Sequence, residues 1–139
     1  MVEHVYRRAS EARLVEAVAV ATDDPRIASA VDAFGGLVVM TRGDHPSGTD
    51  RLAEVATSLD CDIVVNVQGD EPLLPSVAID QAVSPLAARP EVRISTLRRR
   101  LVDERDLAGA SVVKVVVDLE GYALYFSRAP IPYARDAFA

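Results

Sequence analysis

Hydrophobic and polar residues alternate along this chain in a pattern typical of α/β proteins. Helical spacing of apolar residues predicts helices over Val2–Arg13, Pro25–Phe34, Gly48–Leu59 and Pro75–Ala88. Apolar runs predict strands over Val15–Ala21, Leu37–Thr41, Ile63–Gln68, Val92–Leu97, Val112–Asp118 and Tyr122–Phe126. This order predicts one domain, residues 1–139, with a mostly parallel, Rossmann-like sheet and a C-terminal hairpin.

Composition narrows the class of protein. The chain has 139 residues and a net charge of −6, which argues against a nucleic-acid binder because such proteins usually carry a basic face. No apolar run is long enough to span a bilayer, so we expect no membrane partner. The single cysteine, Cys61, adjoins an apolar run and is predicted to be a buried structural thiol in a reducing, cytoplasmic compartment.

The segment Asp62–Pro72 contains the first candidate site. Its apolar run ends at Gly69, so Asp70 and Glu71 fall at the carboxyl end of a predicted strand, where open α/β sheets bind ligands. A carboxylate in that place suits a magnesium ion that carries phosphates. An aspartate there also suits a helix or turn cap, and the residue pattern leaves both roles open.

The polar loop Thr41–Arg51 is the second candidate site. Ser47 and Asp50 have capping-box spacing, which satisfies exposed amides at a helix start. A helix N-terminus also attracts anions, and a glycine there permits close approach of a ligand. The loop therefore suits either a cap or a nucleotide site, whose candidate residues are Arg42, Ser47, Gly48, Thr49 and Arg51.

Other residues carry weaker signals. Neither of the usual triphosphate loops, GxxxxGK[ST] or GxGxxG, occurs in the sequence. His45 has no second histidine or cysteine at ligand spacing, so we expect it to make ordinary hydrogen bonds. Arg128 follows the hairpin and is either a solvated strand end or a partner for a substrate carboxylate.

Five blocks of sequence resemble the 3-deoxy-manno-octulosonate cytidylyltransferases, the CMP-Kdo synthetase family. In chain order the blocks are HVYRRA, VAVATDD, MTRGDHPSGTDRLAEV, VNVQGDEPLLP and VKVVVDLEGYALYFSRAPIPYARD. The resemblance implies a Rossmann-like nucleotide-diphospho-sugar transferase fold. It also implies Mg²⁺-dependent transfer of CMP from CTP to the acid sugar Kdo, with release of pyrophosphate, for lipopolysaccharide synthesis. Family members are homodimers, which implies an interface around Val112–Ile131.

The resemblance also implies roles for particular residues. Asp70 would be the catalytic metal ligand beside the α-phosphate. The sugar acid would be contacted by Gln68 and Arg128. The cytidine would lie against the loop that contains Ser47, Gly48 and Thr49, with support from Arg42 and Arg51.

Compared with the family, the chain lacks a first strand with a triphosphate-binding loop and a C-terminal part with a second acidic ligand. The first strand would lie between Val15–Ala21 and Ile63–Gln68, so we expect this chain alone to be marginally stable and inactive. Two other interpretations stay open. One is a cytidylyltransferase for another acid sugar, such as sialic acid or an amino-Kdo, and the other is a non-catalytic nucleotide-binding remnant.

Overall fold

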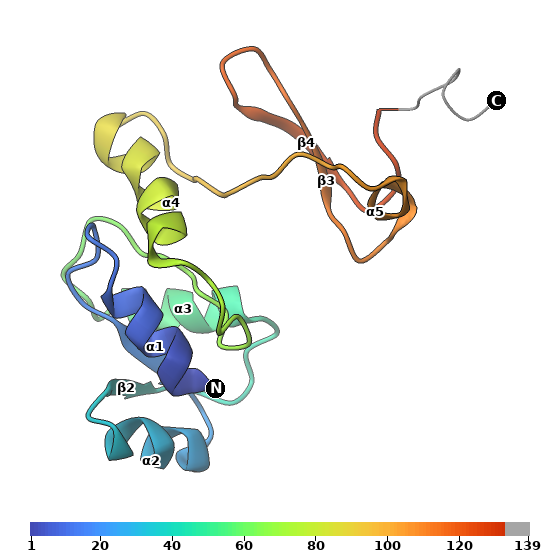
Figure 1. Ribbon diagram of the computed structural model, residues 1–139. Helices are drawn as coiled ribbons and strands as arrows, with labels where there is room; N and C mark the ends of the chain where they lie inside the picture. The colour runs from blue at the N-terminus through green and yellow to red at the C-terminus, as the bar shows by residue number, and fades with distance from the viewer. Residues whose placement is uncertain (133–139) are drawn as a thin grey trace. The chain divides into compact units, whose positions relative to one another are not determined.

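The computed structural model describes residues 1–132 and divides the chain after Leu97 (Figure 1). The first unit contains α1 (Val2–Ser10), β1 (Ala19–Thr22), α2 (Pro25–Ala33), β2 (Leu37–Met40), α3 (Gly48–Ala56) and α4 (Ser76–Ala88). The second unit contains α5 (Glu104–Ala108), β3 (Lys114–Val117) and β4 (Ala123–Ser127). Among residues 1–132, no helix has both the length and the apolar character needed to cross a membrane. The last resemblance block ends at Asp136, outside the described residues.

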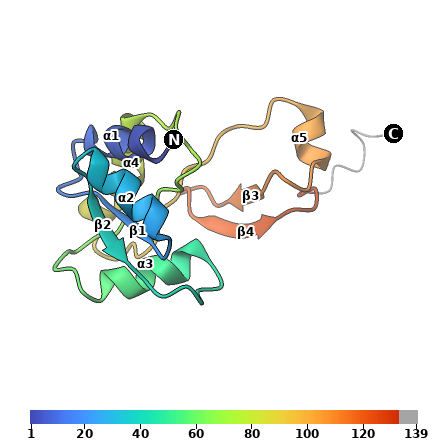
Figure 2. The ribbon, with the colours of Figure 1, turned by 90° about the horizontal axis from the view of Figure 1, so that it is seen from below.

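The parallel pair β1 and β2, with α2 as the crossover, confirms one predicted β-α-β unit (Figure 2). Asp24 caps α2, because its carboxylate accepts a hydrogen bond from the Arg26 N–H at 2.8 Å. Hydrogen bonds from the Arg26 side chain and backbone lower the pKa of Asp24 to about 2. Gly35 ends the helix with a φ of 75°, the left-handed conformation that a glycine cap adopts without steric cost.

The core of the first unit lies where α1 and the residues after it pack against α4 (Figures 1 and 2). The buried apolar cluster consists of Ala9, Ala12, Ile79 and Val83. Outside this cluster, the backbone N–H of Leu14 donates to the Asp80 carboxylate at 2.9 Å. Apolar burial and one long-range hydrogen bond therefore hold these segments together.

Residues 63–68 differ most from the prediction. Ile63, Val65 and Val67 pack against the core cluster, whereas the residues between them are exposed, which is the alternation expected of a strand. No other segment of residues 1–132 forms a ladder with them, so no strand is present there. The apolar pattern decides which face is buried, but a strand also needs a hydrogen-bonding neighbour.

Other expectations also need correction. Residues 92–97 form no strand either, again without a ladder partner in the described residues. Strand β1 begins at Ala19 rather than Val15, because its pairing with β2 begins at Ala19. Val15 and Val18 pack against the core cluster ahead of the paired residues. Helix α5 was not predicted; Asp103 caps it by accepting from a backbone N–H at 2.9 Å. Cys61 is exposed, not buried.

In the second unit, β3 and β4 form the predicted antiparallel hairpin (Figure 2). The Asp118 carboxylate accepts from the N–H groups of Glu120 and Tyr122 at 2.9 and 2.8 Å. Gly121 has a φ of 92°, which glycine adopts at no steric cost. Lys114 is the single buried residue among residues 98–132, so the described part of this unit has no apolar core.

Candidate functional site

The loop between β2 and α3 is held in place by Arg51. Its Nη1 donates to the Thr41 hydroxyl and, at 3.3 Å, to the backbone carbonyl of Arg42. Its Nη2 lies 2.8 Å from a carboxylate oxygen of Asp23, which follows β1. Only a fifth of the Arg51 side chain is exposed. Arg51 therefore joins the loop to the carboxyl end of β1 and gives it a defined shape.

Ser47 caps α3, as its spacing from Asp50 predicts. The Ser47 Oγ accepts from the backbone N–H of Asp50 at 3.2 Å, and the hydroxyl donates to the Asp50 carboxylate. Gly48 begins the helix, and the Gln68 side-chain oxygen lies 3.6 Å from the point that a Cβ on Gly48 would occupy. The N-terminus of α3 thus lies next to Gln68, with the partial positive charge that favours anions.

The first turn of α3 is hydrogen-bonded to the extended segment 63–68. Asn66 Nδ2 donates to Thr49 Oγ1 at 3.3 Å, and Gln68 Nε2 donates to Asn66 Oδ1 at 2.8 Å. Both donors are on the exposed face of that segment. Asn66 was missed from the sequence, although a polar residue two positions before Gln68 in an apolar run shares its face. The two candidate stretches therefore form one continuous surface.

Asp70 lies two residues beyond Gln68, in an exposed turn. Within residues 1–132 its carboxylate accepts no backbone N–H and pairs with no cation, so it caps neither a helix nor a turn there. Asp70 and the residues through Pro75 line a hollow of about 440 Å³. The Asp70 carboxylate oxygens are thus available to a ligand.

The donor groups near Asp70 can be compared with those that magnesium requires. In the described part of the chain, no three His, Cys, Asp or Glu side chains gather into a metal site. Magnesium, however, is commonly held by one or two carboxylates together with substrate phosphates. Asp70, followed directly by Glu71, has oxygen donors of the right kind. These residues fit a magnesium ion that a bound phosphate also holds.

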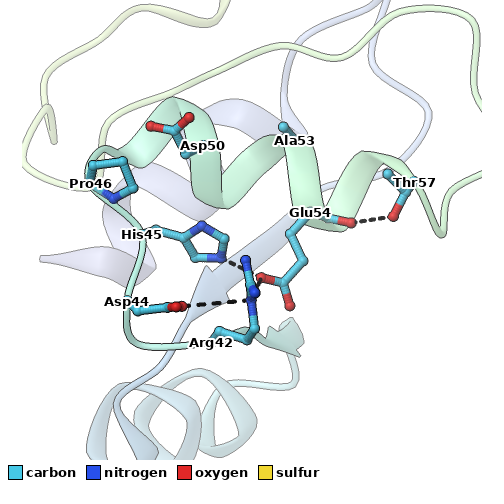
Figure 3. A pocket seen from close by; sticks show the side chains of 8 residues that line it. All are labelled: Arg42, Asp44, His45, Pro46, Asp50, Ala53, Glu54 and Thr57. Atoms are coloured by element: carbon cyan, nitrogen blue, oxygen red, sulfur yellow. Dashed lines mark hydrogen bonds and ion pairs between the residues drawn. The ribbon is translucent and has the colours of Figure 1, made fainter.

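A second hollow of about 580 Å³ opens between the loop and α3 (Figure 3). Its lining is labelled in Figure 3, where the Glu54 side chain extends from α3 toward His45 and Arg42. Glu54 contacts His45 Nε2 and lies 3.5 Å from Arg42 Nε. The hydrogen bond with His45 lowers the pKa of the Glu54 carboxyl, and Arg42 acts in the same direction.

This cluster confirms that His45 makes a side-chain hydrogen bond. Its side chain is only 6% exposed, so its contact with Glu54 connects the loop with the helix in a shielded place. Glu54 was missed from the sequence; its position one turn after Asp50 on the loop side of α3 was the available signal. Arg42 is largely exposed and also lies 3.6 Å from Asp44.

The remaining candidate, Arg128, belongs to the second unit. Its Nη1 donates to the carbonyl of Ala110 at 2.7 Å and to that of Ser111 at 3.5 Å. The loop candidates, Gln68 and Asp70 all lie in the first unit. Within that unit, Arg42 and Asp70 line different hollows that share no residue. The sequence-predicted residues of the first unit therefore follow the loop, the start of α3 and the segment from Asn66 to Asp70, and Arg128 is described within the second unit.

Comparison with known proteins identifies relatives along the whole chain. A 3-deoxy-manno-octulosonate cytidylyltransferase from Geobacter sulfurreducens is 60% identical over 136 residues, covering 98% of this chain and 54% of that protein. The enzyme of the same name from Hahella chejuensis is 58% identical over 142 residues, covering 100% and 55%. The solved structure of a CMP:2-keto-3-deoxy-manno-octonic acid synthetase complexed with CTP matches with a TM-score of 0.88 at 43% identity, covering 99% of this chain and 56% of that one.

These matches confirm the α/β, Rossmann-like transferase fold, since the solved structure superposes on nearly all of this chain. The chain spans about half the length of the curated relatives it matches. The family model described as cytidylyltransferase matches residues 1–139. The chain therefore belongs to the cytidylyltransferase family.

Proposed function

We propose that this protein transfers CMP from CTP to 3-deoxy-manno-octulosonate, releasing pyrophosphate, and that the product serves lipopolysaccharide synthesis. The observation that carries the proposal is the contact between the α3 N-terminus and the segment that leads to Asp70, through Thr49, Asn66 and Gln68. This contact places phosphate-attracting backbone amides, a polar amide pair and an available carboxylate along one stretch of surface. Relatives named for this activity support the choice of substrates.

The nucleotide is assigned to the loop before α3. Ser47, Gly48 and Thr49 would lie against the cytidine, because the cap and the short side chains leave the helix start accessible. Arg51 would act indirectly, since its guanidinium is already bound to the loop and to Asp23. Arg42, which is largely exposed, would support the same pocket.

The groups that bind the sugar acid and the metal are assigned to Gln68 and Asp70 of the first unit and to Arg128 of the second. Gln68 and Arg128 would hold the sugar acid, whose anomeric hydroxyl attacks the α-phosphorus while pyrophosphate leaves. Asp70 would hold magnesium, which neutralises phosphate charge when bound. The protein's own contribution is to orient both substrates in line and to provide cationic donors where charge develops.

Assembly and compartment follow as part of the proposal. Leu124, Tyr125 and Phe126 of β4 are exposed, and a row of exposed large apolar side chains on a strand suits a homodimer interface around residues 112–131. A single cysteine is in keeping with the reducing cytoplasm.

Pyrophosphate release tests the proposal. Purified protein, both the 139-residue chain and the full-length product of its gene, is given CTP, Mg²⁺ and Kdo, with each omitted in turn. We expect the full-length product to release pyrophosphate only when all three are present. Asp70→Asn should abolish release, while Asp32→Asn, which changes a carboxylate outside the site, serves as the matched control.

Three outcomes would contradict parts of the proposal. Release with sialic acid but not with Kdo would make the protein a cytidylyltransferase for another acid sugar. No release with any sugar would favour a non-catalytic nucleotide-binding protein. Release by the 139-residue chain alone would overturn our expectation that this chain is inactive by itself.

A further inference from the structure

Lys114 is an unusual residue for a buried position. It is the only lysine in the sequence, it lies in a run of valines, and it is 2% exposed. Its Nζ donates to three backbone carbonyls, those of Gly109 and Val112 at 2.8 Å and that of Arg128 at 2.5 Å. An ammonium group has three N–H donors and no acceptor, so all of its hydrogen bonds are used.

Nothing in residues 98–132 neutralises this charge with a carboxylate. Among residues 98–132, the acidic groups that form ion pairs are Asp103 and Asp106, and their partners are Arg105 and Arg99. Burying a cation without a carboxylate is costly, and here the three carbonyl acceptors are what offset that cost. What Lys114 does therefore depends on the backbone groups that it holds.

The three carbonyls show what Lys114 organises. One belongs to Arg128, and the other two flank Ala110 and Ser111, whose carbonyls accept hydrogen bonds from Nη1 of Arg128. Lys114 thus holds the Arg128 backbone and both ends of the short loop that the Arg128 side chain contacts. The Nε–Nη2 edge of the guanidinium has no partner within residues 98–132.

We propose that Lys114 is a positioning residue that fixes Arg128, so that the Nε–Nη2 edge of its guanidinium remains free to bind a carboxylate through two parallel hydrogen bonds. Two N–H donors in a plane match the two oxygens of a carboxylate. The buried ammonium also adds positive charge at the Arg128 backbone carbonyl. The sugar carboxylate as the ligand rests on the proposed function; the control of Arg128 by Lys114 does not.

The first experiment measures steady-state kinetics on the full-length product of the gene. Lys114→Gln keeps two N–H donors but removes the charge, and Arg105→Gln removes an exposed arginine of the same unit as a control. We expect Lys114→Gln to raise KM for Kdo about tenfold, the effect of one charge-assisted hydrogen bond. KM for CTP should change less than about twofold, because CTP is assigned to the first unit. Equal rises in both KM values would indicate a general structural role and overturn the proposal.

The second experiment needs no substrate. Relaxation of ¹⁵N at Arg128 Nε reports whether the guanidinium is ordered, and we expect order in the wild type and rapid motion in Lys114→Gln. Unchanged order would overturn the proposal. If the Gln variant loses its hairpin signals, Lys114→Arg replaces it, because it keeps the charge and displaces the donors. Absence of pyrophosphate release in the wild type would refute the proposed function, while the relaxation data would still decide the role of Lys114.

Discussion

The two units of this chain bury side chains of opposite character. In Met1–Leu97 every buried residue except Thr22 is hydrophobic, and the largest cluster lies between α4 and the end of α1. In residues 98–132 the single buried residue is Lys114, while the apolar side chains of β4 are exposed. The first unit is therefore stabilised by apolar burial, and the described part of the second by hydrogen bonds, those of the β3–β4 hairpin and the three made by Lys114.

This difference determines what each unit should tolerate. Apolar burial is non-directional, so it responds chiefly to lost volume. Three hydrogen bonds to one ammonium need donors in defined directions, so they respond chiefly to lost donors. The predictions that follow test this contrast from the largest expected effect to the smallest.

Lys114→Met keeps the volume of the side chain and removes its donors. We expect the second unit to lose about 3 kcal/mol of stability, because three partly exposed carbonyls each lose a hydrogen bond at about 1 kcal/mol. Amide hydrogen exchange of residues 114–127 measures the stability of the second unit separately from that of the first. If Lys114→Met left stability unchanged or raised it, as replacement of some buried charges does, the second unit would not depend on the donors of Lys114.

Val83→Ala removes volume from the first unit and no donor. We expect a loss of about 2 kcal/mol, from two buried methyl groups at about 0.8 kcal/mol each plus the cavity left behind. Val77→Ala is the matched control, since Val77 is on the same helix but 56% exposed; it should change stability by less than about 0.5 kcal/mol. Urea denaturation, monitored through hydrogen exchange of the amides of α1 and α4, distinguishes the two variants. Equal effects would mean that the α4 face does not form the core.

Ser47→Ala removes a single polar contact from the first unit. We expect a loss of about 1 kcal/mol, the usual contribution of an N-cap, because the Asp50 N–H loses its acceptor. Ser47→Asn, which retains a capping oxygen, should restore most of that stability. Exchange rates of the first-turn amides of α3 provide the measurement, and an unchanged rate in the Ala variant would show that the cap is dispensable.

The smallest effect concerns two matched caps, one in each unit. Asp24 and Asp103 both accept from the backbone and side chain of an arginine two residues later, which lowers the pKa of each carboxyl. Because the pKa of each carboxyl is lowered in the folded state, each cap stabilises the fold at pH values above the ordinary pKa of 3.8. That stability is lost as the pH falls toward the lowered pKa, which is about 2 for Asp24. Carboxyl ¹³C titration should show both groups ionised at pH 3.8. Midpoints at the ordinary value in either unit would contradict these caps.

Local features of this fold could be predicted from the sequence. Asp24 with Pro25 marks the start of α2, Gly35 marks its end, and Glu120 with Gly121 marks the hairpin turn. Each signal depends on residues that are neighbours in the chain. The Ser47 cap was predictable for the same reason.

Long-range features could not be predicted in this way. Residues 63–68 have the composition and alternation of a strand, but pairing depends on another segment, which composition does not reveal. The contact of Glu54 with His45 and the hydrogen bond of Lys114 to the Arg128 carbonyl likewise join residues of different segments, 9 and 14 positions apart, and no signal from neighbouring residues marks them. The candidate site was therefore predicted as two separate stretches, and its connection through Asn66 came only from the structure.

The exposure of Cys61 has a practical consequence for this contrast. Because it is the only cysteine and its thiol is accessible, one maleimide dye attaches at one place without any prior mutation. That place is in the first unit, just ahead of residues 63–68. Fluorescence from the dye would report the unfolding of the first unit at a single defined place, with no other thiol in the sequence to compete for the label.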